Sequence, residues 1–126
     1  MPIGKLLFIY GTLLREGTTR GMMQSADFRG TAKISGRLVH VDQYPGLLLD
    51  SNTMVTGELY WVDENLLQEL DRYEGCFETP PLYTREEVMA TDGHSKTHRA
   101  QTYVFQQLAP HHETIEHGDW IKYANQ

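Results

Sequence analysis

A single amphipathic segment, DENLLQELDRYEG at residues 63–75, interrupts a chain whose other apolar stretches are all short. Asp63 is a residue type that caps helix N-termini, Glu64 favours the positive end of the helix, and Gly75 stands where a helix commonly ends. The sequence therefore predicts one clear helix in the middle of the chain. Everything else has to fold around it from short elements.

Short strand-like segments lie on both sides of this helix. Brief apolar runs and period-2 alternation, bounded by turn residues, predict strands at residues 5–10, within 28–41 on either side of Gly36, at 54–62, and in a hairpin formed by 82–91 and 99–106. Residues 18–28 are only weakly helical, and Pro45-Gly46 indicates a turn before an apolar triplet. One helix among several short strands predicts an α+β fold with a strongly curved, barrel-like sheet.

The strand expected at 54–62 alternates in a way that predicts one well-buried face. Val55, Leu59 and Trp61 fall on one side of it, and Tyr60 falls on the other. Gly57 inside this pattern indicates a bulge or a close approach of another backbone.

Composition sets the class of protein. The 126 residues, 40% of them hydrophobic, suit one domain over residues 1–126 with a real core. The net charge of -6 and the absence of a Lys/Arg run argue against a nucleic-acid partner. The single cysteine, Cys76, excludes an intramolecular disulfide and offers no thiol pair for a metal. No apolar run approaches the roughly 20 residues of a membrane span and no secretory pattern is present, so a cytoplasmic protein without membrane contact is expected.

One carboxylate of the predicted helix falls on its apolar side. On a helical wheel the apolar stripe consists of Leu66, Leu67, Leu70 and Tyr73. Glu74 lies inside this stripe, whereas Asp71 lies at its edge. Burial and the negative end of the helix would both raise the pKa of Glu74, as a general acid/base near neutrality requires. The alternative is a frayed helix end with Glu74 in water.

Other candidate sites are weaker. Cys76 is of a residue type that more often packs than attacks. The HHETIEH stretch lacks the HExxH order of a zinc site, and a solvated polar tail is the favoured interpretation. Several aromatic residues fit best as strand core, and of these Tyr83 could also reach a pocket; they are Tyr60, Trp61, Tyr83, Tyr103 and Phe105.

Six short motifs together resemble one known family. FIYGTL, YPG at 44–46, GELYWV, LDRYEGC, LYTR and GDW occur in this order over nearly the whole chain. They resemble the γ-glutamylcyclotransferase-like family, and most closely its small bacterial members and the γ-glutamylaminecyclotransferases. The resemblance implies a compact α+β fold in which a small mixed β-barrel is flanked by short helices.

The resemblance also implies a site. The family holds the γ-glutamyl part of its substrate in the loop after the first strand, which here comprises Tyr10, Gly11, Thr12 and Leu13. Its catalytic carboxylate lies in the LDxxEG segment, which makes it Glu74, the residue that the helical wheel nominated. Thr12 stands where other branches carry Ser.

The LYTR motif supplies two further candidates. Tyr83 and Arg85 are plausible substrate-binding residues in the pocket. Arg85 could meet the α-carboxylate of the substrate, or it could form a structural ion pair.

The implied reaction is an intramolecular cyclisation. The α-amino group of a small γ-glutamyl compound attacks its own γ-carbonyl, releasing 5-oxoproline and an amine, with no metal or organic cofactor. The enzyme supplies no nucleophile, which agrees with the lack of a credible Ser/His or Cys/His set. A non-catalytic binder of small carboxylates such as 5-oxoproline is the alternative, and a metal-binding histidine tail is a weaker third. The leaving amine and the oligomeric state stay open.

Overall fold

The computed structural model describes residues 4–11, 13–14 and 20–125. Its strands are β1 (Gly4–Ile9), β2 (Asp27–Ser35), β3 (Arg37–Val41), β4 (Tyr44–Leu48), β5 (Met54–Asp63), β6 (Tyr83–Asp92), β7 (Thr97–Phe105) and β8 (Thr114–Ile115). Its helices are the 3-10 turn η1 (Arg20–Met23) and the α-helices α1 (Glu64–Tyr73) and α2 (Trp120–Ala124). No described helix has both the length and the apolar character needed to cross a membrane.

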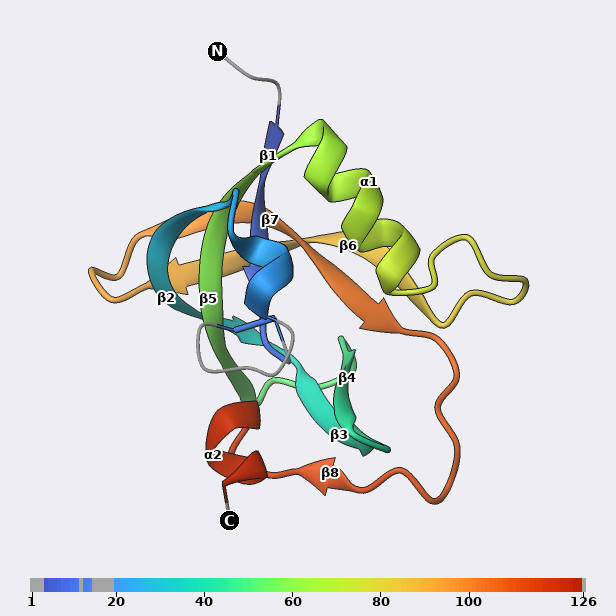
Figure 1. Ribbon diagram of the computed structural model, residues 1–126. Coiled ribbons are helices and arrows are strands. Elements are labelled where there is room, and N and C mark those ends of the chain that lie inside the picture. Colours follow the sequence, from blue (N-terminus) through green and yellow to red (C-terminus); the bar gives the residue numbers. More distant parts are fainter. Residues whose placement is uncertain (1–3, 12, 15–19, 126) are drawn as a thin grey trace.

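Five strands close into a barrel in the order β1-β5-β2-β6-β7 (Figure 1). Four of the strand contacts are antiparallel, and β1 meets β7 in parallel at Leu7 and Gln101. The predicted small mixed barrel with flanking short helices is therefore confirmed. A second sheet, ordered β4-β3-β8, lies at the opposite end of the molecule from the start of α1.

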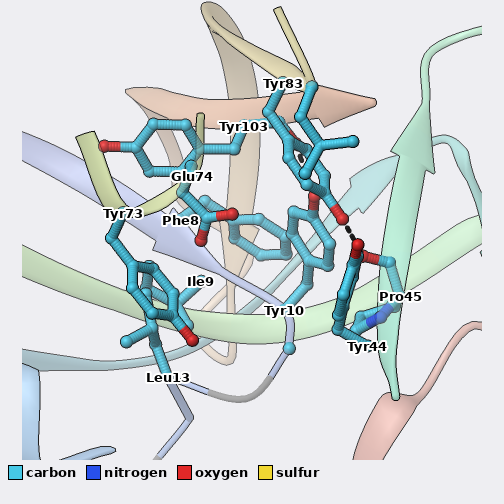
Figure 2. Close-up of a pocket in the computed structure, with 12 residues that line it drawn as sticks. Phe8, Ile9, Tyr10, Leu13, Tyr44, Pro45, Tyr73, Glu74, Tyr83 and Tyr103 are labelled. Atoms are coloured by element: carbon cyan, nitrogen blue, oxygen red, sulfur yellow. Dashed lines mark hydrogen bonds between the residues drawn. The ribbon is translucent and has the colours of Figure 1, made fainter. Parts of the chain in front are cut away.

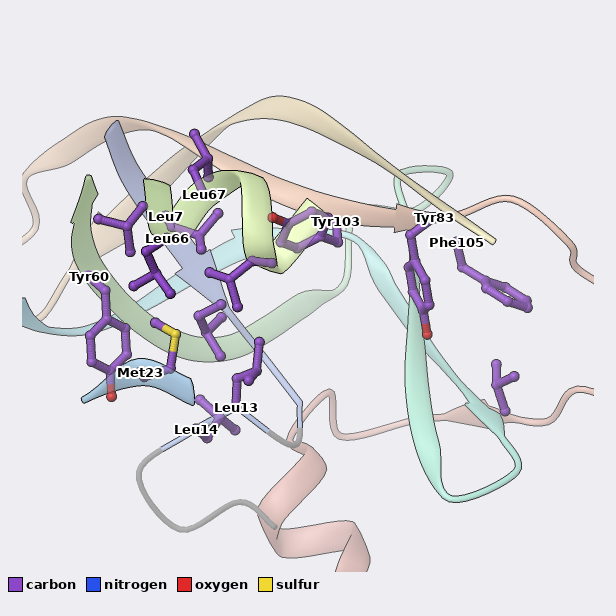
Figure 3. Close-up of a cluster of buried hydrophobic side chains, with 14 of the residues drawn as sticks. Leu7, Leu13, Leu14, Met23, Tyr60, Leu66, Leu67, Tyr83, Tyr103 and Phe105 are labelled. Carbon is purple, nitrogen blue, oxygen red and sulfur yellow. The ribbon is translucent and has the colours of Figure 1, made fainter. Parts of the chain in front are cut away.

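Helix α1 lies against the outside of the barrel with the expected ends. The side chain of Asp63 accepts a hydrogen bond from the Leu66 N–H at 2.8 Å, and Gly75 ends the helical segment with a positive φ of 75°. Leu66 and Leu67 reach the cluster of side chains between helix and barrel in Figure 3. Tyr73 is 46% exposed, so its predicted place in the buried stripe is wrong.

Strand β5 is buried on both faces rather than on one. Leu59 packs in the cluster inside the barrel with Phe8, whereas Tyr60 packs in the cluster beneath η1 and α1. Trp61, on the same side of the alternation as Val55 and Leu59, is only half-buried. The prediction of a single buried face is wrong because one hydrophobic cluster packs against each face of β5.

Gly57 of β5 marks a close approach of backbones. A Cβ atom at this position would lie 2.3 Å from the carbonyl oxygen of Ile9 and 2.5 Å from the ring of Phe8. The close-approach interpretation of Gly57 is confirmed. The bulge of this region lies on the neighbouring strand β2, between Phe28 and Gly30.

The turn expected at Pro45-Gly46 lies instead at Asp42 and Gln43, where Asp42 has a φ of 50°. Pro45 and Gly46 are inside β4, so the turn prediction is wrong. The chain tolerates Pro45 there because β4 is an edge strand. Gly46 is required by packing, since a Cβ would lie 2.8 Å from the ring of Phe105.

Two other predicted elements differ in length from those observed. The weak helix expected over 18–28 is reduced to η1, because β2 already begins at Asp27; residues 18 and 19 lie outside the described part of the chain. The predicted hairpin of β6 and β7 is confirmed, with strands that run further into its tip, as far as Asp92 and from Thr97.

Candidate active site

A cavity of about 220 Å³ opens between the end of β1, strand β4 and the C-terminal end of α1 (Figure 2). The residues that line it are mostly aromatic or aliphatic: Phe8, Ile9, Tyr10, Gly11, Leu13, Tyr44, Pro45, Tyr73, Glu74, Leu82, Tyr83 and Tyr103. Glu74 is the only carboxylate among these described lining residues, and none of them is cationic. The cavity therefore presents a single ionisable acid in apolar surroundings.

Glu74 is the C-cap residue of α1. Its N–H donates to the Leu70 carbonyl at 2.8 Å, and the turn through Gly75 follows at once. Figure 2 shows its carboxylate directed among the aromatic rings of the cavity. The alternative of a frayed end with Glu74 in bulk water is not the arrangement in this structure.

Burial raises the pKa of the Glu74 carboxyl from its ordinary value of 4.5 to about 7. Among the described residues, no group donates a hydrogen bond to its oxygens. Such donors would stabilise the charged form and lower the pKa again. The carboxyl group therefore exchanges a proton near neutral pH, and both of its oxygens face the cavity.

Three tyrosines form a neutral wall around Glu74. The Tyr10 hydroxyl donates to the Tyr103 carbonyl at 2.5 Å, and the Tyr83 hydroxyl donates to the Pro45 carbonyl at 2.6 Å. Burial is the main reason why the pKa of each of Tyr10, Tyr83 and Tyr103 lies above the ordinary value of 10.0. Because the hydroxyls of Tyr10 and Tyr83 donate to backbone carbonyls, these side chains are held in place. The raised pKa values keep the wall uncharged.

Most of the residues predicted for the site come together here. Five of them line the cavity: Tyr10, Gly11, Leu13, Glu74 and Tyr83. Thr12 lies outside the described residues. Arg85 does not line the cavity, and its guanidinium is paired with Asp71. Of the two possibilities raised for Arg85, the structure contains the ion pair.

Asp71 is the residue that the sequence reasoning passed over. It is buried, and it accepts hydrogen bonds from Arg85 and from the Tyr103 hydroxyl. Its position at the edge of the apolar stripe made it unremarkable. The signal that could have identified it is its spacing of three residues from Glu74, which places both carboxylates on nearly the same side of the helix.

The remaining candidates do not contribute an ionised nucleophile or a metal centre to the described structure. Burial is the main cause that raises the pKa of the Cys76 thiol from 9.0 to about 11, which keeps it protonated and weakly reactive. No three or more His, Cys, Asp or Glu side chains of the described residues cluster in a way that could hold a metal ion.

Comparison with known proteins places the chain in a family. Residues 7–122 match the family model described as "Gamma-glutamyl cyclotransferase, AIG2-like". The chain belongs to this family. That assignment agrees with the closed five-stranded barrel.

Relatives in the AIG2-like γ-glutamyl cyclotransferase family carry names that support cyclotransferase activity. The γ-L-glutamyl-butirosin B γ-glutamyl cyclotransferase of Niallia circulans is 38% identical over 126 aligned positions, covering 95% of this chain and 78% of that protein. The γ-glutamylaminecyclotransferase of Rattus norvegicus is 32% identical over 91 positions, covering 63% of this chain and 58% of that protein. The crystal structure of an AIG2-like protein from Mus musculus superposes with a TM-score of 0.77 at 30% identity, covering 86% and 81% of the two chains.

Proposed function

We propose that this protein is a γ-glutamyl cyclotransferase that converts a γ-glutamyl amide to 5-oxoproline and a free amine, with Glu74 as the proton-transfer group. The observation that carries this proposal is a lone carboxyl group of pKa about 7 that lines an aromatic cavity. A protein that only bound small carboxylates would gain nothing from an acid at this position. The family and the names of the relatives support the same reaction.

The first step of the proposed reaction is proton transfer from the substrate to Glu74. The α-ammonium group of the γ-glutamyl part gives a proton to the Glu74 carboxylate, which frees the nitrogen lone pair. That nitrogen attacks the γ-carbonyl carbon of the same molecule and closes a five-membered ring. The nucleophile is tethered in the substrate, so the cavity needs only to hold a reactive conformer.

The second step breaks the amide bond and restores Glu74. The oxyanion that develops on the γ-carbonyl oxygen is met by backbone N–H groups of the loop after β1, of which Gly11 and Leu13 line the cavity. Collapse of this intermediate expels the amine, which takes its proton from the protonated Glu74. The α-nitrogen gives up a second proton as the ring closes, and Glu74 passes this proton to the departing nitrogen as well. Two protons therefore leave the α-nitrogen and two reach the leaving nitrogen, which departs as an ammonium group, and Glu74 ends as a carboxylate.

The size of the cavity indicates which part of the substrate is enclosed. Its volume of about 220 Å³ is smaller than the roughly 300–1,000 Å³ of pockets that enclose a drug-sized ligand. A γ-glutamyl group fits the enclosed space. The leaving amine then lies toward the mouth, beside the half-buried Tyr44 and the exposed Tyr73. We therefore infer that the cavity recognises the γ-glutamyl part of the substrate.

The test is to incubate the purified protein with a panel of γ-glutamyl amines and γ-glutamyl amino acids and to measure 5-oxoproline. We expect release from at least one compound, and a loss of about a hundredfold or more in kcat for Glu74→Gln. Glu78→Gln is the matched control, because Glu78 is exposed and does not line the cavity. Undiminished turnover in Glu74→Gln would remove this residue from the mechanism. Tight binding of 5-oxoproline without any turnover would favour a binding protein.

A further inference from the structure

Asp71 is a buried carboxylate for which the proposed reaction has no use. It lies on α1 three residues before Glu74 and is 7% exposed. Its Oδ1 accepts hydrogen bonds from Arg85 Nε at 2.9 Å and from the Tyr103 hydroxyl at 2.7 Å, and its Oδ2 accepts from Arg85 Nη2 at 3.2 Å. Both oxygens are thus occupied by strong, charge-assisted bonds. This arrangement suits an anchor rather than an acid or a base.

The partners of Asp71 form one cross-strand pair on the barrel. Arg85 of β6 stands directly opposite Tyr103 of β7 in the antiparallel register, so both side chains leave the same face of the hairpin. Arg85 Nη1 also donates to the side-chain oxygen of Gln101 at 3.2 Å, which fixes the guanidinium from a second strand. The barrel therefore places the Arg85 guanidinium and the Tyr103 hydroxyl side by side, facing the end of α1.

Glu74 needs such an anchor because, in the described part of the chain, no hydrogen bond holds its own carboxylate. No described residue donates to its oxygens, and a direct donor would also lower its pKa and occupy the lone pairs that the substrate must meet. Its backbone belongs to the last turn of a helix, a position that commonly frays. The anchor must therefore act through the helix and away from the carboxylate itself.

We propose that Asp71 and Arg85 are positioning residues for Glu74: their ion pair pins the last turn of α1 to the β6–β7 hairpin and so holds the Glu74 carboxylate over the cavity. Tyr103 belongs to the same arrangement. It lines the cavity, its hydroxyl donates a hydrogen bond to Asp71, and its backbone carbonyl accepts one from the Tyr10 hydroxyl. The inference rests on the proposed cyclotransferase function. It assigns Arg85 to the support of the base and not to the substrate.

The test compares kcat and KM across variants of the pair. We expect Arg85→Gln to lower kcat about ten- to a hundredfold while KM changes little, because a displaced base loses rate rather than ground-state binding. Arg85→Lys keeps one charged donor and should recover part of the lost kcat. Arg99→Gln is the matched control, since Arg99 forms an exposed ion pair with Glu87 and should leave kcat unchanged.

Tyr103→Phe provides a second variant that keeps the shape of the wall. It removes a single hydroxyl from the Asp71 carboxylate, and we expect a smaller loss of kcat than in Arg85→Gln at an unchanged melting temperature within a few degrees. A rise in KM with kcat intact in both variants would overturn the positioning role, as would Arg85→Lys losing as much as Arg85→Gln.

Hydrogen exchange gives a readout that does not depend on activity. The amides at the pinned end are those of Glu74, Gly75 and Cys76, which donate to carbonyls of the last turn at 2.8, 3.1 and 2.9 Å. In Arg85→Gln we expect them to exchange faster than in the wild type, and the first turn of α1 to be unaffected. If the wild type released no 5-oxoproline, the proposed function would fail while this result still supported the pinning. Unchanged exchange at these amides in Arg85→Gln would overturn the proposed positioning role of the Asp71–Arg85 pair.

Discussion

Glu74 is a carboxylate that the fold largely shields from water, and no residue that the structure describes donates a hydrogen bond to it. Burial places its pKa at about 7, so both the protonated and the ionised form are populated near neutral pH. A group in this state can accept a proton from the substrate and return it to the leaving amine. A salt bridge like that of Asp71 would hold the side chain more firmly but would commit it to the charged form.

The first prediction at this scale concerns the pH dependence of activity. We expect kcat/KM for a γ-glutamyl substrate to fall about tenfold per pH unit as the pH drops below about 7, because protonated Glu74 cannot act as the base. Rates measured from about pH 5 to about pH 9 at constant ionic strength check this. A decline of kcat/KM centred at pH 4.5, the ordinary pKa of a glutamate carboxyl, would contradict this prediction.

The second prediction concerns stability. The folded-state pKa of Glu74 lies above its unfolded value, so its stabilising contribution is complete below pH 4.5 and is lost as the pH rises through about 7. Glu74→Gln avoids this loss. We expect it to be more stable than the wild type at pH 8, by at most about 3 kcal/mol from a shift of 4.5 to about 7.

Urea denaturation of Glu74→Gln and wild type at several pH values is the measurement. The gain should shrink steadily towards pH 4.5. Glu78→Gln, at an exposed position, should show no such pH-dependent gain. An equal stability difference at every pH would mean that burial of charge at Glu74 is not its source.

At the scale of elements, the contact between β5 and β1 sets where the cavity can form. Gly57 allows the end of β1 to lie directly on β5, and the loop that begins at Tyr10 leaves from that contact. The sequence pattern identified this glycine as a point of close approach but could not name the partner. Which strand lies against it depends on the order of the barrel, and that order is a long-range property.

A substitution at Gly57 tests this contact. Gly57→Ala would place a Cβ 2.3 Å from the backbone oxygen of Ile9, which cannot move without shifting β1. We expect a loss of about 3 kcal/mol or more in the free energy of unfolding, measured with urea. Gly93→Ala is the control, since nothing lies within 4 Å of the added atom there. A small effect at Gly57 would show that β1 shifts freely.

At the scale of the whole molecule, the barrel closes through a narrow seam. Strands β1 and β7 share one parallel register pair, Leu7 with Gln101. The fully buried Thr102 adds a bond across this seam, because its hydroxyl donates to the Phe8 carbonyl at 2.9 Å. The seam brings Tyr103 beside the end of β1, where its carbonyl accepts the Tyr10 hydroxyl.

Removal of this hydroxyl should weaken closure of the barrel. Thr102→Val keeps the branched shape but removes this donor from the Phe8 carbonyl, and we expect a loss of about 1–3 kcal/mol in the free energy of unfolding. Thr97→Val, at an exposed position of the same strand, should change stability by less than about 0.5 kcal/mol. Equal effects at the two positions would argue against a special role for the seam bond.

Local patterns determined the class of fold and nominated the acid. The cap at Asp63, the positive φ at Gly75 and the place of Glu74 within the apolar stripe all follow from contacts within one helix. Such short-range effects can be read from neighbouring residues. The motif resemblance supplied the rest of the predicted site, including the loop from Tyr10.

Only the tertiary structure decided what surrounds that acid. The cavity requires β1, β4, β6, β7 and the end of α1 to meet, and the sequence does not state their order around the barrel. For the same reason Pro45-Gly46 was predicted as a turn although it lies in an edge strand, and the pattern placed Asp71 only at the edge of the apolar stripe. Arg85 and Tyr103 meet Asp71 only because antiparallel pairing sets them side by side, and that register is fixed by packing across the whole chain.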